Sequence, residues 1–141
     1  SKEPLGSSVT YRSKEGGYVT LYFYDFDVPK IPDGADSSEV KAQMKQAEGE
    51  IKYFEEMGRY KNVKKVSSGK VMLGGDEGSV EALHANINLE AQGDKLTSDI
   101  FIFGKKNLFI KIRATRLRGD GKTPDKTFRE LMAKLDEFFA E

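Results

Sequence analysis

The chain has 141 residues, of which 38% are hydrophobic, and its 23 basic and 23 acidic side chains cancel. This length is enough for one domain with a substantial core, and the balanced charge argues against nucleic-acid binding as a main function. The absence of cysteine excludes disulfides, thiol nucleophiles and cysteine-ligated zinc or iron–sulfur sites.

The N-terminal part predicts a spacer followed by two strands. We expect residues 1–7 to be a flexible polar spacer and residues 8–141 to form a single domain. Strands are predicted at 8–12 and 18–27, because β-branched and aromatic residues gather there on either side of a glycine-containing turn. The second strand places four aromatic side chains on one face: Tyr18, Tyr22, Tyr24 and Phe26. Such a stripe either lies beneath a helix or stacks on a sugar, a base or a protein partner.

A long helix is predicted at residues 37–58. Asp36 and Glu39 fit a capping box at its start, and Gly58 is a suitable end. Apolar residues recur at spacings of three and four along the segment: Val40, Met44, Ala47, Ile51, Phe54 and Met57. This single stripe indicates that one side of the helix packs on a sheet.

The middle of the chain predicts a run of antiparallel strands. Two short strands are expected at 61–67 and 70–73, and a turn at 74–78 leads into a longer strand at 80–91. The strongest signal is the segment 99–115, in which two apolar arms flank a short Gly-Lys-Lys-Asn turn. It predicts a β-hairpin at the centre of the sheet.

The expected register of this hairpin assigns residues to faces. We expect Phe101 to lie opposite Ile110, and Asp99 to lie opposite Ile112 at the end of the core face. An odd-numbered loop at 92–96, or a bulge, would then place four residues of the preceding strand on the same core face: Leu83, Ala85, Ile87 and Leu89.

The C-terminal part predicts a second helix, at residues 124–139. Thr123 is a suitable N-cap, and Pro124 fits the first turn. The order of elements therefore predicts an α+β fold, in which an antiparallel sheet of about six or seven strands packs against two helices.

His84 is the only histidine, so it is the only side chain that titrates near neutral pH without help. With a carboxylate such as Asp99 it would form the centre of a small enzyme site, and it would share a face with Asn86. The alternative is an ordinary half-exposed strand residue. The sequence shows no recognised nucleophile, metal or cofactor motif, so we expect no catalytic residue, metal or cofactor.

The densest run of charge is basic: Lys105, Lys106, Lys111, Arg113, Arg116 and Arg118. Lys111 and Arg113 should point to one face together with Phe109, and His84 is a candidate for the same face. With Tyr22 and Tyr24, these residues form the candidate binding surface. Such a surface suits an anionic protein, a lipid headgroup or a polysaccharide. The alternatives are a solvated edge, or salt bridges to the glutamates of the long helix.

The chain also carries two resemblances to known proteins. The tyrosine-rich N-terminal hairpin, long helix, antiparallel meander and C-terminal helix together resemble the PsbP-like fold. Residues 98–115 are similar to a pattern in uncharacterised exported bacterial proteins: Ser, apolar strand, turn, then apolar-Lys-apolar-Arg-Ala-Thr. These resemblances imply a periplasmic or secreted location and a non-catalytic, protein-associating role.

We therefore expect a binding or accessory module of the bacterial cell envelope. The alternative is a small enzyme around His84 and Asp99. No apolar run of the sequence is long enough to cross a bilayer, so we expect no transmembrane segment.

Overall fold

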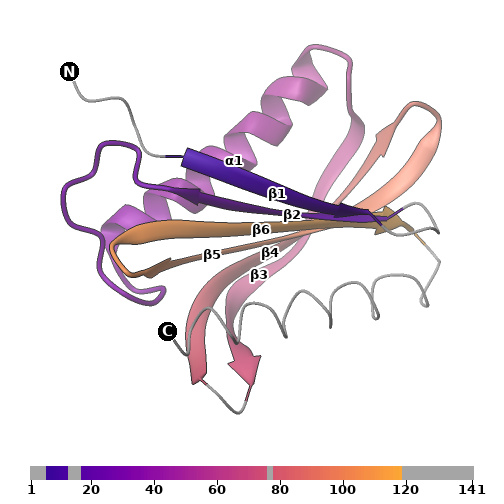
Figure 1. Cartoon of the computed structure of the whole chain (residues 1–141). Helices are drawn as coiled ribbons and strands as arrows, with labels where there is room; N and C mark the ends of the chain where they lie inside the picture. Colours follow the sequence, from indigo (N-terminus) through magenta and orange to yellow (C-terminus); the bar gives the residue numbers. More distant parts are fainter. Residues whose placement is uncertain (1–5, 13–16, 76–77, 119–141) are drawn as a thin grey trace.

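A computed structural model describes residues 6–12, 17–75 and 78–118. These residues form a six-stranded antiparallel sheet, in the order β1-β2-β6-β5-β4-β3, with one helix on one of its faces (Figure 1). The elements are β1 Gly6–Arg12, β2 Tyr18–Tyr24, α1 Ser38–Glu56, β3 Lys61–Gly75, β4 Gly78–Ala91, β5 Asp94–Lys105 and β6 Leu108–Leu117. The antiparallel sheet and the long helix are confirmed. The helix predicted at 124–139 lies outside the described residues, so it stays a prediction.

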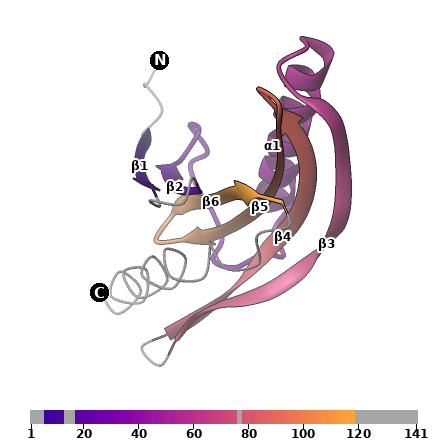
Figure 2. The ribbon, with the colours of Figure 1, turned by 90° about the vertical axis from the view of Figure 1, so that its right-hand side faces the viewer.

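The strands differ from the predicted ones at several places. β2 ends at Tyr24, before the predicted end at residue 27, because Phe26 and Asp27 adopt left-handed φ angles in a turn. β1 begins at Gly6, inside the predicted spacer, because Gly6 and Ser7 already pair with β2. The two short strands predicted at 61–67 and 70–73 are one continuous strand, β3, which pairs with β4 on both sides of Gly69. Two register shifts near its start mark irregularities of the bulge type, which bend a strand. Figure 2 shows the resulting strong curvature of β3 and β4.

The predicted registers of both central hairpins are wrong. β4 and β5 are joined by a two-residue turn at Gln92 and Gly93, whose φ angles of 52° and 83° match the left-handed turns that connect twisted strands. Ile87 therefore pairs with Ser98. The β5–β6 hairpin also has a two-residue turn, so Asp99 pairs with Ala114 instead of Ile112.

The consequence is that the sheet has an apolar core on each face. On the face covered by α1, the core contains residues of the helix stripe and of β4, β5 and β6: Val40, Met44, Ala47, Ile51, Ala85, Ile87, Leu89, Ile100, Ile102 and Phe109. The opposite face has its own core: Val19, Leu21, Leu73, Val80, Ala82, Phe101, Phe103, Ile110, Ile112 and Ala114. The odd-numbered β4–β5 loop was predicted on the assumption that the apolar residues of β4 and of the β5–β6 hairpin lie on one face. That assumption was wrong.

The ends of α1 differ in detail from the predicted ones. Its N-cap is Ser37, whose side chain accepts a hydrogen bond from the backbone N–H of Val40 (3.1 Å). The predicted cap, Asp36, instead forms an ion pair with Lys70 of β3. Met57, the last residue of the predicted stripe, is exposed and lies just beyond the last residue of the helix.

The loop between β2 and α1 is fastened to the β5–β6 hairpin. Gly34 and Gly104 exchange two backbone hydrogen bonds of 2.9 Å, and the side-chain oxygen of Asn107 accepts from the backbone N–H of Ile31 (2.8 Å). Gly104 is required at this position because a Cβ atom there would fall on the carbonyl oxygen of Pro32. This attachment sets the position of the loop that follows β2.

Candidate functional site

A groove of about 430 Å³ lies between α1 and the β1–β2–β6 side of the sheet. Its sheet side is lined by residues of β2 and β6: Tyr22, Phe23, Tyr24 and Lys111. Its helix side is lined by residues of α1: Gln43, Gln46, Ala47 and Glu50. We call this hollow the tyrosine groove. It offers aromatic rings, amide groups, one amine and one carboxylate to a ligand.

Strand pairing places the sheet residues of the groove side by side. Tyr22 pairs with Lys111, and Tyr24 pairs with Phe109, across the antiparallel β2–β6 ladder. The Lys111 ammonium lies over the Tyr22 ring, 4.4 Å from its centroid. Phe109 is fully buried and its ring packs on that of Tyr24, with 5.4 Å between centroids. Phe109 therefore supports the groove from below and does not face a ligand.

Burial controls the charges in the tyrosine groove. Burial lowers the pKa of Lys111 and outweighs the opposing effect of the nearby Glu50 carboxylate; the charge of Arg113 lowers it further. Burial, with a contribution from Glu50, raises the pKa of Tyr24 to about 12. In the described part of the chain, no carboxylate forms an ion pair with Lys111. Among the described residues, Glu50 therefore influences the amine only without direct contact.

Phe26 forms the lip of the tyrosine groove. Its φ angle of 52° lies in the left-handed region, which is uncommon for a bulky residue. The turn that holds it is closed by a 2.8 Å hydrogen bond from the Val28 N–H to the Asp25 carbonyl. Phe26 is 49% exposed as a residue, and its ring meets that of Tyr24 edge-on, with 6.2 Å between centroids. The fold therefore holds an exposed aromatic ring beside the groove.

Arg113 points to the same face of the sheet as Lys111 but belongs to a different environment. Its Nε donates to the Ser98 hydroxyl (3.0 Å), and its terminal nitrogen donates to the Tyr60 hydroxyl at 3.4 Å. It does not line the tyrosine groove. Lys111 and Arg113 therefore do not form the single basic surface that was predicted, since only Lys111 lines the tyrosine groove.

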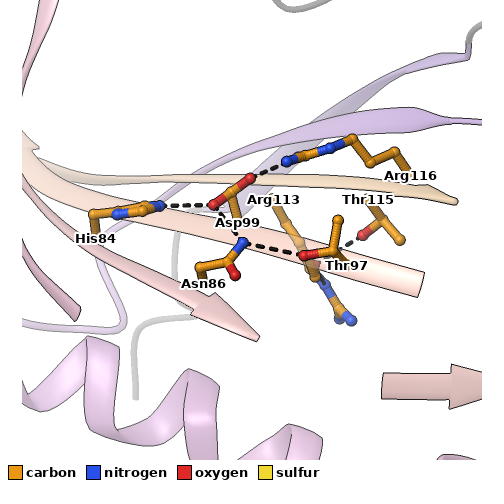
Figure 3. Close-up of polar contacts among 8 residues, drawn as sticks. His84, Asn86, Thr97, Asp99, Arg113, Thr115 and Arg116 are labelled. Atoms are coloured by element: carbon orange, nitrogen blue, oxygen red, sulfur yellow. Dashed lines mark hydrogen bonds and ion pairs between the residues drawn. The ribbon is translucent and has the colours of Figure 1, made fainter. Parts of the chain in front are cut away.

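His84 lies on the opposite face of the sheet, in a network centred on Asp99 (Figure 3). Its Nε2 is 2.7 Å from one carboxylate oxygen of Asp99, which also accepts from the Asn86 amide (2.9 Å). The other oxygen accepts from Arg116 at 2.7 Å. The His84 ring stacks on Phe101, with 4.7 Å between centroids. We call these four polar residues, His84, Asn86, Asp99 and Arg116, the Asp99 network.

The partners of Asp99 keep it ionised. Burial alone would raise the pKa of this carboxyl group, but hydrogen bonds from Arg116, His84 and Asn86, with the charge of Arg116, lower it below its ordinary value. His84 and Asp99, the two residues named for the alternative enzyme site, lie in contact with each other, although the expected register placed Asp99 opposite Ile112. The expected shared face of His84 with Lys111 and Arg113 is wrong, because the two-residue β4–β5 turn reverses the faces of β4 relative to β6.

Three of the six predicted site residues, Tyr22, Tyr24 and Lys111, meet in the tyrosine groove. Sequence reasoning missed the helix side of the groove. Gln43, Gln46 and Glu50 recur at spacings of three and four beside the apolar stripe. This spacing would have predicted that the three side chains lie on one face of the helix. The sequence did not predict which strands this helix face lies against.

No protein-family model matches the chain, and no curated protein matches its sequence. Within residues 6–12, 17–75 and 78–118, no helix is both long and apolar enough to cross a membrane. The same residues contain no group of three or more His, Cys, Asp or Glu side chains that could hold a metal ion.

Proposed function

We propose that this protein is a non-catalytic binding module and that its ligand is a polysaccharide strand carrying carboxylate groups, seated in the tyrosine groove. The observation that carries the proposal is the position of Lys111 in this groove: an amine with no ion-pair partner in the described residues, held over the Tyr22 ring. A location in the bacterial envelope and an accessory role belong to the same proposal.

The chemistry of the lining supports a sugar ligand. Exposed faces of tyrosine and phenylalanine pack against the apolar faces of pyranose rings, and the amides of Gln43 and Gln46 can both donate to and accept from hydroxyl groups. A carboxylate on the sugar would supply the negative charge that Lys111 lacks. Phe26, whose backbone lies in the left-handed region, extends the aromatic surface at the edge of the groove.

The charges of the groove favour a sugar chain over a surface of dense negative charge. Lys111 is half-buried in the lining of the groove, and Glu50 lines the same groove. Glu50 shares the groove and would repel a dense array of negative charge. In a polymer with one carboxylate per sugar, a carboxylate can lie against Lys111 while neutral hydroxyl groups lie against Glu50.

The test is a titration of the protein with an oligogalacturonate, with a neutral malto-oligosaccharide of equal length alongside. We expect saturable binding of the acidic oligosaccharide and weaker binding of the neutral one, followed by isothermal calorimetry. Tyr22→Ala should weaken binding of both, whereas Lys111→Met should remove the preference for the acid. Tyr53→Ala is the matched control, because Tyr53 is an exposed tyrosine of α1 outside the groove.

Failure of both oligosaccharides to bind, or binding that Tyr22→Ala leaves unchanged, would reject the groove as the site. The location is tested separately, by fractionating cells that make the protein. Recovery of the protein with a cytosolic marker would contradict the envelope part of the proposal.

The second candidate function is a small enzyme centred on His84. It is favoured by the 2.7 Å contact between His84 and Asp99 and by the anchoring of Asp99 by Arg116 and Asn86, which would orient the imidazole as a general base. Hydrolysis of 4-nitrophenyl acetate that disappears in His84→Gln would support it. An equal rate in the parent and the variant would assign the Asp99 network to stability alone.

A further inference from the structure

A second hollow on the α1 face is built around arginine. It has a volume of about 310 Å³ and lies where the end of β1, the start of β2, the end of β6 and the β4–β5 turn come together. Arg12, Arg113, Tyr18 and Tyr60 line it. We call it the arginine pocket. None of the described residues that line it belongs to the tyrosine groove, so its function is independent of the ligand proposed above.

Arg113 is held in position from below. The Ser98 hydroxyl, which accepts from its Nε, is fully buried and pairs with the Thr115 hydroxyl at 2.9 Å. The Tyr60 hydroxyl accepts from its terminal nitrogen, and the guanidinium lies 5.9 Å from the centroid of the Tyr60 ring. A guanidinium has several further N–H donors. The buried Ser98–Thr115 pair therefore fixes Arg113 while part of its hydrogen-bonding capacity still faces the pocket.

Arg12 approaches the same pocket from the edge strand. It pairs in register with Tyr18, and its guanidinium lies 5.8 Å from the centroid of that ring. The pocket thus has two guanidinium groups on separate strands, each beside a tyrosine ring. Among its described lining residues, Asp94 is the single carboxylate. The lining therefore carries an excess of positive charge.

The positive character continues beyond the pocket. A neighbouring hollow of about 740 Å³ shares Tyr60, Ala91 and Gln92 with it and adds Arg59 and Lys61. The carboxylate of that hollow, Glu90, accepts a 2.6 Å hydrogen bond from Asn62. Glu90 keeps its negative charge, so the two cations, Arg59 and Lys61, give the described lining of that hollow a modest positive excess that adds to the charge of the arginine pocket.

We propose that the arginine pocket binds the phosphate group of a small phosphate monoester. Two guanidinium groups on different strands suit a tetrahedral anion with several charged oxygens, whereas a planar carboxylate is satisfied by one guanidinium fork. The volume is at the lower end of small-molecule sites, which fits a sugar phosphate. The tyrosine rings flank the organic part, and the Gln92 amide is placed to bind its hydroxyls.

The experiment is a calorimetric titration of the whole chain with glucose 6-phosphate, inorganic phosphate and glucose in separate runs. We expect saturable binding of both phosphates, with glucose 6-phosphate the tighter, and no binding of glucose. Arg113→Gln and Arg12→Gln should each weaken phosphate binding at least about tenfold, because each removes charge-assisted hydrogen bonds. Asp94→Asn should strengthen it.

Lys64→Gln is the control for charge, since it removes one exposed cation that does not line the pocket. Arg12 lies on an exposed strand, so its variant remains informative if Arg113→Gln disturbs folding. Phosphate affinity unchanged in Arg12→Gln, or no saturable binding up to about 10 mM ligand, would overturn the proposal. Binding of inorganic phosphate equal to that of glucose 6-phosphate would overturn the sugar-phosphate assignment.

Discussion

Replacement of Asp99 by alanine should destabilise the protein by about 3 kcal/mol. The change removes the acceptor for hydrogen bonds from His84, Asn86 and Arg116, at distances of 2.7, 2.9 and 2.7 Å. Hydrogen bonds to a charged group contribute about 1.5–3 kcal/mol each, and the cost of burying the carboxylate offsets part of their sum. The side chains of Asp99 and Arg116 are 17% and 26% exposed, so solvent screens the pair only in part.

Urea unfolding followed by far-ultraviolet circular dichroism measures this loss at neutral pH. Asp94→Ala is the matched control, because Asp94 is an exposed residue of the same strand and its replacement should change stability by less than about 0.5 kcal/mol. An Asp99→Ala effect no larger than that of the control would refute the reasoning.

The same variant should also change the acid limb of the stability curve. The folded state lowers the pKa of Asp99 below the ordinary value of 3.8, so its contribution is present above that pH and is lost as pH falls through the folded pKa. The parent should therefore lose more stability than Asp99→Ala below about pH 4. Parallel acid limbs would contradict the assigned ionisation.

Three further predictions concern the framework and the groove. Ser37→Ala should lower the free energy of unfolding, measured in urea, by about 1 kcal/mol, because it removes the N-cap of α1. Ser38→Ala, at the exposed neighbouring residue, should lower it clearly less. Equal effects would contradict the assignment of Ser37 as the cap. Gly104→Ala should lower the melting temperature strongly, because the new Cβ atom would collide with the carbonyl oxygen of Pro32. Gly49→Ala should raise the melting temperature, because Gly49 lies on α1 with open space around it. The reverse order would contradict the described packing of Gly104. Because the folded state raises the pKa of Tyr24 from 10.0 to about 12, its stabilisation is complete below pH 10 and is lost as pH rises toward 12. Tyr24→Phe should flatten that part of the stability curve, and an unchanged slope would show that the phenol titrates normally.

Local patterns in the sequence were sufficient to locate most elements and to assign the faces within each of them. Alternation with period two placed Tyr22 and Tyr24 on one side of β2, and Lys111 and Arg113 on one side of β6. The spacing of Val40, Met44, Ala47 and Ile51 identified the side of α1 that packs on the sheet. These patterns are readable without the fold, because each depends only on the geometry of one strand or one helix.

The way in which the faces of different strands combine is a property of the tertiary structure. A one-residue change of register moves every side chain of a strand to the other face, and such a change is detectable in a sequence when one face is polar. Here both faces of β5 are apolar, so the pattern of β4 did not distinguish an odd loop from the two-residue turn at Gln92 and Gly93. That turn separates His84 from Lys111 and joins it to Asp99. The Asp99 network, the tyrosine groove and the arginine pocket all follow from contacts between elements distant in the chain, which local periodicity does not encode.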